Sequence, residues 1–442
     1  MTWKMVKLGE IITESRIPSV NPDPNKRITV RLNLLGVEKR PLENEKAGAT
    51  KQFIRKAGQF IYGKQNFHKG AFGIIPDELD GFESSADLPS FDVRKDCLPE
   101  WIFYFFKQGD FYLELAKIAR GVATQRIHPE QIYDLEIPLP DIETQKKIIA
   151  SIKAIEEKGV KLKNELSRQL TLIDQLNQAI LQEAVQGKLV PQDPKDEPAS
   201  ELLKRIKAEK ATLRQAQGKG KKEKPLPPIK AEEIPFEIPE NWVWCRLGEI
   251  CEINPRNNVD DEIDAGFIPM SMVSQLFGVK PSYEVRKWGE IKTGFTHFAN
   301  NDVVVAKITP CFENSKAGII SDLPNGVGAG TTELNVLRGN QFVLPEYIYS
   351  FVKRIDFLKN GERIMKGVAG QKRVPTEYFY NTLIPLPPLS EQKRIVAEIE
   401  KQFTKTKQLK EHIIANQQAT EQLLKALLHQ AFEVREVEEV NS

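Results

Sequence analysis

The stretch IPLPPLSEQKRIVAEIE at residues 384–400 closely resembles the stretch IPLPDIETQKKIIASIK at residues 137–153. Each copy opens on a segment that we expect to be extended, because residues that precede proline avoid the α region. A charged run with apolar residues at steps of three and four follows, which predicts a long amphipathic helix. The two copies start about half a chain apart, so the repeated unit is a whole domain with its helix rather than a short solenoid repeat.

The repeat extends well beyond these stretches. Three further pairs of segments match in the same order: VKLGEII (residues 6–12) with CRLGEIC (245–251), LPEWIFYFF (98–106) with LPEYIYSFV (344–352), and GVATQRIHPEQIYDLEIPLP (121–140) with GVAGQKRVPTEYFYNTLIPLP (367–387). Between the first and second of these pairs the halves diverge into short β-branched segments broken by glycine, proline and asparagine, which predict strands of an irregular mixed sheet. We call the matching segments of each half the frame, and the divergent segment between them the variable region. The chain therefore repeats the frame and changes the variable region.

The two predicted helices each carry one narrow apolar stripe. Its members are Ile152, Ile155, Leu162, Leu166, Ile173, Leu176 and Ile180 in the first helix, and Ile395, Ile399, Leu409, Ile413, Leu423 and Leu427 in the second. Gly159 and Thr406 are among the positions that weaken the stripe. A narrow stripe on two matching helices favours a coiled coil between them. The alternative is that each stripe packs against its own domain, as most amphipathic helices do.

Length and composition limit the class of protein. A chain of 442 residues exceeds the size of one hydrophobic core, so at least two domains are expected. With 40% hydrophobic and 28% charged residues it is an ordinary globular sequence, and a net charge of +2 neither indicates nor excludes a polyanionic partner. The four cysteines form no Cys-x-x-Cys pair, which favours reduced thiols without a structural metal. Without a signal sequence or an apolar membrane span, we expect a cytoplasmic location.

The sequence shows no catalytic signature. A Walker A sequence for nucleotide hydrolysis is missing, and the glycine run at residues 326–330 is followed neither by a helix nor by the acidic residue that a dinucleotide site needs. No cysteine and histidine stand in a context that suggests a nucleophile. Together with the repeated frame, this favours a binding module over an enzyme.

These observations predict an α+β protein with two similar mixed α/β domains and two long helices. The first domain spans residues 1–140 and its helix 141–190. A charged, proline-rich linker that begins with a short helix spans 191–238. The second domain spans 239–387 and its helix 388–436.

The order of these parts resembles a known family. The segments LVPQDPKDEPASELL, IPENWVWCRLGEI, KITPCFENSKAG (307–318) and GQKRVPTEYF (370–379), together with the two IPLP helices, are similar over nearly the whole chain to the specificity (S) subunit of Type I restriction-modification systems. The resemblance implies two target recognition domains, each reading one part of a split double-stranded DNA site, and two long helices packed as an antiparallel coiled coil that separates them.

The resemblance also implies the partners. Two modification subunits, which methylate adenine, and restriction subunits, which translocate and cut DNA, are expected to bind this frame. S-adenosylmethionine, ATP and Mg are expected on those partners and no cofactor on this chain, which performs no chemistry itself. Two alternatives remain: a coiled-coil scaffold without sequence-specific DNA binding, and an S-type subunit that serves a fused restriction-methylation enzyme.

The candidate DNA-binding residues fall in two loops of each domain. The first domain offers Lys64, Gln65, Asn66, His68 and Lys69 in its variable region and Arg120, Thr124, Gln125 and Arg126 before the exit segment; the second offers Lys307, Thr309, Asn314, Ser315 and Lys316, and Lys366, Gln371, Lys372 and Arg373. Base edges are read by basic, amide and hydroxyl side chains, whereas phosphates accept any basic or amide donor. Because the glutamine-basic loop recurs in both halves, we assign it to the DNA backbone and the variable loops to base reading. A solvent-exposed turn is the alternative for any single residue.

Overall fold

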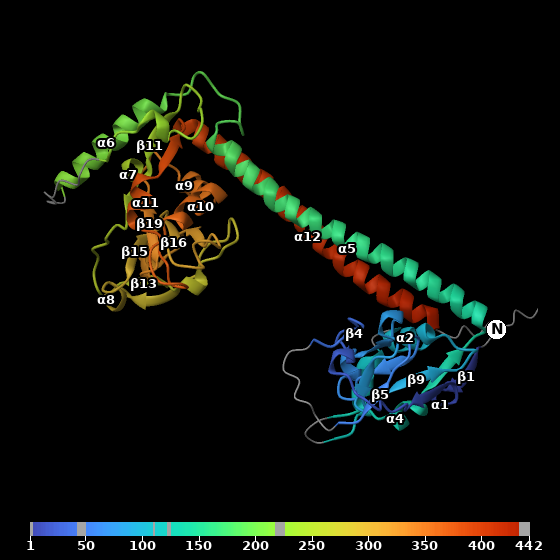
Figure 1. Ribbon diagram of the computed structural model, residues 1–442. Coiled ribbons are helices and arrows are strands. Elements are labelled where there is room, and N and C mark those ends of the chain that lie inside the picture. Colours follow the sequence, from blue (N-terminus) through green and yellow to red (C-terminus); the bar gives the residue numbers. More distant parts are fainter. Residues whose placement is uncertain (1–2, 42–49, 109–110, 122–124, 217–225, 433–442) are drawn as a thin grey trace, which may run out of the picture. The chain divides into compact units, whose positions relative to one another are not determined.

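The computed structural model describes residues 3–41, 50–108, 111–121, 125–216 and 226–432. They form two units: unit 1 consists of the described residues up to Arg168 and from His412 onward, and unit 2 of Gln169–Glu411. Each unit holds one copy of the repeated frame and parts of two long helices (Figure 1). In both copies the frame runs strand, short helix, strand, variable region, short helices, strand, long helix.

The frame of unit 1 begins and ends in one antiparallel strand pair. β1 (Lys4–Lys7) pairs with β10 (Glu136–Leu139), and Val6 lies opposite Ile137. The Ile-Pro-Leu-Pro exit is therefore extended, as its prolines predict. The prolines are tolerated because this sheet has only two strands, so a missing N–H can face away from the partner strand.

The variable content of unit 1 is a four-stranded antiparallel sheet in the order β2-β9-β6-β7, with two additional strand pairs. Its strands are β2 (Ile12–Ser15), β9 (Ser90–Val93), β6 (Phe60–Tyr62) and β7 (Phe72–Ile74); the pairs are β3 (Ile28–Val30) with β4 (Val37–Lys39), and β5 (Gln52–Ile54) with β8 (Glu83–Ser85). The short helices are α1 (Leu8–Ile11), α2 (Pro99–Lys107), α3 (Phe111–Glu114) and α4 (Pro129–Tyr133). An aromatic core forms where Phe60 of β6 stacks on Phe106 of α2, with ring centroids 5.8 Å apart.

Unit 2 repeats the frame around a larger variable region. β11 (Val243–Arg246) pairs with β20 (Leu383–Leu386), and two four-stranded sheets follow. One is β12 (Glu252–Ile253), β19 (Leu334–Arg338), β16 (Val303–Ala306) and β17 (Ala317–Ile319); the other is β14 (Glu284–Lys287), β13 (Asp264–Ile268), β18 (Val327–Gly330) and β15 (Thr296–Ala299). The pair β13–β18 is parallel, so the second sheet is mixed, whereas the described strand pairs of unit 1 are all antiparallel.

The remaining helices of unit 2 come from the frame, from the predicted linker and, in the case of α8, from the variable region. They are α7 (Leu247–Ile250), α8 (Trp288–Ile291), α9 (Pro345–Val352), α10 (Ile355–Arg363), α11 (Thr376–Asn381) and α6 (Ala199–Ala216). α6 buries Leu202 and Ile206 in the same core as Trp242 and Tyr347, so the first part of the linker belongs to the fold of unit 2. The lysine-rich part of the linker, residues 217–225, lies outside the described residues.

A buried glutamine in the first turn of each long helix connects three segments of the frame by hydrogen bonds. Gln145 is fully buried; its side-chain N–H groups donate to the carbonyl oxygens of Asp96 (2.9 Å) and Pro140 (2.8 Å), and its oxygen accepts from the N–H of Leu98 (2.8 Å). Gln392 makes the matching three bonds in unit 2, to Phe342, Pro387 and Leu344. The same residue of the repeated stretch thus joins the exit segment, the long helix and the Leu-Pro-Glu helix twice.

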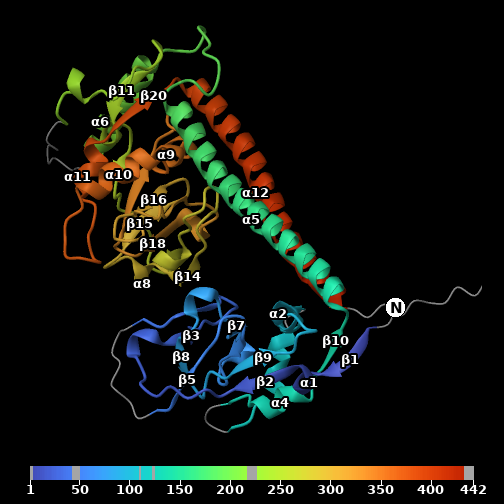
Figure 2. The same ribbon diagram turned by 45° about the vertical axis from the view of Figure 1, so that its right-hand side comes forward.

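The two long helices run antiparallel in both units. They are α5 (Ile142–Val185) and α12 (Leu389–Phe432), side by side in Figure 1 and Figure 2. In unit 1, Lys163 forms an ion pair with Glu421 (3.1 Å) and Gly159 packs against Leu424. In unit 2, Asp174 lies 3.4 Å from Lys410 and Asn177 accepts a 2.8 Å bond from Thr406. Along these contacts the residue numbers rise in α5 as they fall in α12, which confirms an antiparallel coiled coil.

The coiled coil differs from the predicted stripe. The line with seven-residue spacing through Ile152, Gly159, Leu166, Ile173 and Ile180 is buried in α5, as is the line through Ile399, Thr406 and Ile413 in α12. Four other predicted members are about half exposed: Leu162, Leu176, Leu409 and Leu423. Ile155 and Leu427 are half-buried, and Ile395 is fully buried. The helices meet along one line each because small residues at weak stripe positions, such as Gly159, allow close approach there. Only part of each predicted stripe is therefore buried.

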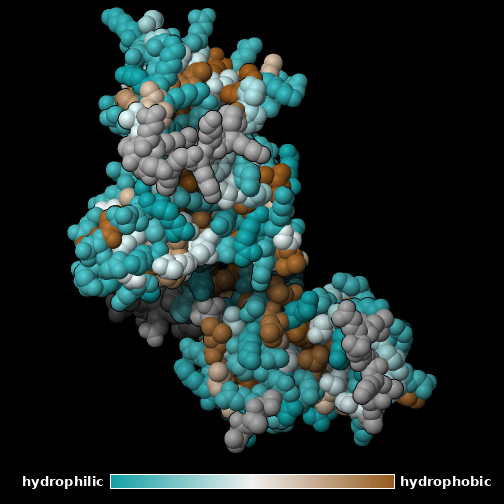
Figure 3. All heavy atoms as spheres, turned by 90° about the vertical axis from the view of Figure 1, so that its left-hand side faces the viewer, coloured by the Kyte–Doolittle hydropathy of each residue, from teal (hydrophilic) through white to brown (hydrophobic). Residues whose placement is uncertain are grey.

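The far end of each long helix enters a domain core within its own unit. Phe432 of α12 packs on Trp101 of α2 in unit 1, with ring centroids 4.5 Å apart. In unit 2 the end of α5 buries Leu181 and Val185 in the core. Hydrophilic residues predominate on the face drawn in Figure 3, and among the described residues no helix combines the length and apolarity needed to cross a membrane.

Candidate nucleic-acid interface

The variable loop of unit 1 is held from beneath by its own apolar residue. Phe67 is fully buried and begins a short turn (Phe67–Lys69), which Gly70 ends in a left-handed conformation with φ +76°. The predicted residues around it face outward to different degrees: Lys69 is exposed, and Lys64, Gln65, Asn66 and His68 are half-buried. The buried Phe67 and the turn at Gly70 together leave three polar side chains and two lysines at or near the surface.

The segment at Asn33 and Leu34 supports this turn through backbone hydrogen bonds. The N–H groups of Asn33 and Leu34 donate to the carbonyl oxygens of Lys69 and Gly70 at 2.9 Å. Leu34 itself has φ +61°, a conformation that costs energy for a leucine. Burial lowers the pKa of His68, and its Nδ1 bonds to no described residue. His68 is therefore a neutral side chain near pH 7.

The frame loop of unit 1 lies directly beside the variable loop. Arg120 and Arg126 exchange two backbone hydrogen bonds of 2.8 Å, which close a hairpin, and the N–H of Ile127 donates to the carbonyl of Lys64 at 2.8 Å. Arg126 also approaches Asp87 (3.8 Å), whose carbonyl accepts from the N–H of Lys64. The structure thus brings the two predicted groups of unit 1 together. Gln125 and Arg120 are exposed, and Thr124 lies outside the described residues.

The two predicted groups of unit 2 are likewise adjacent. The N–H of Thr309 donates to the carbonyl of Lys372 at 2.9 Å, and the N–H of Val374 donates to that of Lys307 at 2.8 Å. Lys366 and Arg373 close the frame hairpin as the two arginines do in unit 1. Both domains therefore present one surface built from a variable loop and a frame hairpin.

Several predicted side chains of unit 2 already have partners in the protein. Arg373 forms two 2.8 Å bonds with Glu333, which raise the pKa of Arg373 and lower that of Glu333. Lys316 donates to the carbonyl of Met270 (3.1 Å), and the hydroxyl of Thr309 lies 2.7 Å from Glu313. These three side chains hold the loop in shape.

The remaining predicted side chains of unit 2 point to solvent or lie at the edge. They are Lys366, Gln371, Lys372 and Asn314, which are exposed, and Lys307 and Ser315, which are half-buried. Burial lowers the pKa of Lys307. The exposed set contains two cations and two amides, the side-chain types suited to phosphate and base contacts.

A hollow of about 680 Å³ opens beside these residues. The sequence analysis did not identify all of the residues that line it. Thr309, Glu313 and Lys372 line one side, and Lys359 and Arg363 of α10 line the other. The two α10 cations stand four residues apart on one helix face, a spacing that could have indicated them. The hollow mixes cations with carboxylates, so it is not a purely anionic or cationic site.

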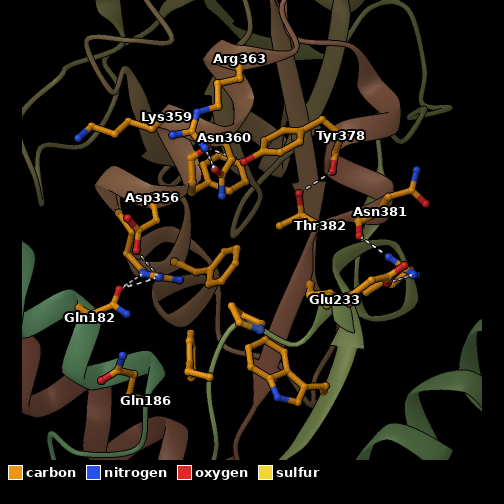
Figure 4. Close-up of a pocket in the computed structure, with 18 residues that line it drawn as sticks. Gln182, Gln186, Glu233, Asp356, Lys359, Asn360, Arg363, Tyr378, Asn381 and Thr382 are labelled. Atoms are coloured by element: carbon orange, nitrogen blue, oxygen red, sulfur yellow. Dashed lines mark hydrogen bonds and ion pairs between the residues drawn. The ribbon is translucent and has the colours of Figure 1, made fainter. Parts of the chain in front are cut away.

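Another hollow of unit 2, of about 730 Å³, lies among frame elements (Figure 4). Arg354, which lies between α9 and α10, reaches across it and donates to Gln182 of α5 at 2.6 Å and to Asp356 of α10 at 3.2 Å. On its other side Arg246 contacts Glu233 at 2.7 Å. The hollow joins α5, the end of the linker, α10 and α11 rather than the variable loops.

One buried arginine of unit 1 organises the segment next to the candidate interface. Arg55 donates to Ser84, Ser90 and the carbonyls of Ser15, Ser85 and Leu88 at 2.7–3.3 Å. Burial lowers the pKa of Arg55 to about 10, although the charge of Glu14 opposes the shift. Sequence reasoning missed Arg55, because its partners are mostly backbone carbonyls that leave no trace in the sequence. Among the described residues, no three His, Cys, Asp or Glu side chains are grouped as metal ligands.

The repeated frame with different loops defines a class of protein. Residues 1–172 and 239–417 match the family model described as Type I restriction modification DNA specificity domain, and the chain belongs to this family. Among curated proteins, it is 51% identical over 270 residues to the Type I restriction enzyme EcoAI specificity subunit of Escherichia coli, and 50% identical over 270 residues to the EcoEI specificity subunit of the same species. These matches cover 61% of this chain but 46% and 45% of the relatives, so the chain spans about half the length of the curated relatives it matches.

Solved structures share the fold. A chain from work on complex assembly and conformational transition of the type I R-M system superposes with a TM-score of 0.64 at 17% identity, covering 98% of both chains. The HsdS subunit from Thermoanaerobacter tengcongensis superposes with a TM-score of 0.56 at 17% identity, covering 98% of this chain and 96% of that one. At this identity the likeness establishes the fold.

Proposed function

We propose that this chain is the DNA sequence-recognition subunit of a Type I restriction-modification complex. One observation carries the proposal: each unit presents a variable loop and a recurring hairpin side by side, on a frame with the same order of elements. A protein that reads two different half-sites with one docking geometry needs this combination. Family membership supports the assignment to DNA.

Within each interface we assign the two loops different roles. The exposed Gln125 and Gln371 stand on the hairpin that recurs in both units, so they contact phosphates. Lys69 and Asn314 stand on loops that differ, so they and their loop neighbours read bases. Arg373 supports this surface through Glu333 rather than contacting DNA.

The same proposal covers partners and chemistry. Two modification subunits and the restriction subunits bind the frame, where half-exposed leucines such as Leu176 and Leu409 and the hollow crossed by Arg354 offer surface. This chain is non-catalytic and cytoplasmic and holds no cofactor; S-adenosylmethionine, ATP and Mg belong to the partners.

The test is single-molecule sequencing of DNA from cells that carry this chain and its modification subunit. A split motif with methylated adenines that disappears when this chain is deleted is the expected result. A methylome unchanged by the deletion contradicts the proposal and favours a protein scaffold. Purified chain that methylates DNA alone would contradict the non-catalytic role.

A further inference from the structure

Lys353 is a buried cation at the end of a frame helix, directly behind the candidate interface of unit 2. It follows α9 and is 4% exposed. Its ammonium donates to two backbone carbonyls, those of Gln275 (2.8 Å) and Ser315 (2.6 Å). A buried lysine without bonding partners is costly, so these two carbonyls are what keeps it there.

Both carbonyls belong to the variable region. Ser315 lies in the predicted base-reading loop in a left-handed conformation, with φ +58°. Gln275 lies in the segment at residues 274–278, where Phe277 packs on Phe403 of α12 with ring centroids 4.1 Å apart. The hydroxyl of Tyr349 on α9 accepts from the N–H of Gly278 at 3.0 Å. One lysine and one tyrosine of the frame thus hold two variable segments against the frame.

The matching lysine of unit 1 is used differently. Lys107 occupies the same place after the Leu-Pro-Glu segment, but its ammonium pairs with Glu156 of α5 (2.5 Å), which also accepts from Tyr104 (2.9 Å). The position that matches Glu156 in the second copy is Phe403. In unit 1 the lysine therefore connects two frame elements, α2 and α5. In unit 2, where Phe403 replaces the carboxylate, Lys353 bonds the variable region instead.

We propose that Lys353 is a positioning residue for base reading by the second domain. It fixes the loop that contains Ser315 relative to α9 without contacting DNA. The inference depends on the proposed function and adds to it a specificity determinant that lies behind the DNA-facing surface.

The test compares Lys353→Met with Lys107→Met in the full chain, expressed with its modification subunit, by sequencing methylated DNA. Lys353→Met keeps the length of the side chain and removes the two bonds. We expect one half of the split motif to lose at least several-fold of its base discrimination while the other half stays unchanged. Lys107→Met, the matched control, should leave both halves unchanged because the ammonium of Lys107 bonds Glu156 of α5 rather than a variable segment.

A second variant covers the case in which Lys353→Met does not fold, as judged by circular dichroism. Tyr349→Phe removes only the hydroxyl that holds Gly278 and keeps the ring packed on Phe277. It should relax the same half of the motif more weakly.

Three outcomes separate the two proposals. Folded variants that retain the wild-type motif overturn the role of Lys353, and so does equal relaxation of both halves. A wild-type chain that produces no split motif overturns the proposed function itself, before any variant is measured.

Discussion

Gln145 and Gln392 show, at the scale of a residue, how one buried amide defines this frame. The side-chain amide of each glutamine forms hydrogen bonds with backbone groups of two separate segments, and neither side chain is exposed. Both stand at the same place in the repeated stretch, so the sequence shows that the residue recurs. Its partners are backbone atoms, so the sequence cannot show what it bonds.

Gln392→Leu should destabilise unit 2. The leucine fits a buried site of similar size, but two carbonyls and one N–H lose their partner, which costs about 2–4 kcal/mol in the free energy of unfolding. Urea denaturation of the variant checks this. Gln408→Leu, at an exposed position of the same helix, is the control and should stay within about 0.5 kcal/mol of wild type. Equal stabilities for both variants would show that the three bonds contribute little.

Lys353 should make stability depend on pH in a defined window. Burial lowers its pKa to about 7 from the ordinary value of 10.5. Between these values the unfolded chain holds a proton that the folded chain lacks, so the free energy of unfolding rises with pH, by at most about 1.4 kcal/mol per unit. Below pH 7 both states are protonated and this slope vanishes.

Denaturation of wild type and of Lys353→Met at pH 7 to 10 isolates this contribution, because all other titrating groups are shared. The difference between their stabilities should grow in favour of wild type as pH rises. Tyr349, the ring beside the ammonium, has its pKa raised to about 12 and stays protonated throughout. A constant difference would mean that Lys353 keeps its ordinary pKa.

At the scale of an element, the long helices depend on small residues as much as on apolar ones. A Cβ added at Gly159 would lie 2.6 Å from the nearest atom of Leu424. Gly159→Leu should therefore lower the free energy of unfolding by about 1–3 kcal/mol through overpacking, in spite of the higher helix propensity of leucine. Thermal unfolding followed by circular dichroism measures it.

The control is Lys158→Leu, one residue away on the exposed surface of α5. It adds the same side chain without meeting α12, so its melting temperature should stay near that of wild type. If Gly159→Leu were as stable as this control, the close contact at Gly159 would not limit the helix pair.

At the scale of the whole molecule, the paired helices should set the spacing of the DNA site. Inserting one heptad into α5 after Arg168 and one into α12 before His412 keeps the antiparallel register and adds about 10 Å of helix. Under the proposed function, the methylated motif should gain a longer spacer while both half-site sequences stay the same. Half-sites that change in sequence would refute the ruler role. An insertion in one helix alone should instead disrupt pairing.

Much of the fold was predictable because it repeats. Matching segments at both ends of each domain predicted two copies of one frame, and the extended exit and the antiparallel helix pair follow from the prolines, the stripes and the family resemblance. Which members of each stripe are buried was not predictable, since Leu162 and Ile152 look alike in sequence and only the contact between the helices decides which is buried. The sequence predicted the variable loop and the hairpin of each candidate interface as two separate groups of residues. It did not predict that they lie side by side.

The sequence by itself determined that this protein has one frame used twice, because a repeat of apolar, proline and glutamine positions records constraints that both copies share. Only the tertiary structure decided how each copy uses that frame. Lys107 and Lys353 hold equivalent positions, yet one bonds a carboxylate and the other two carbonyls. The reason is physical: backbone carbonyls are common to every residue, so which of them surrounds a buried cation is settled by how the chain packs.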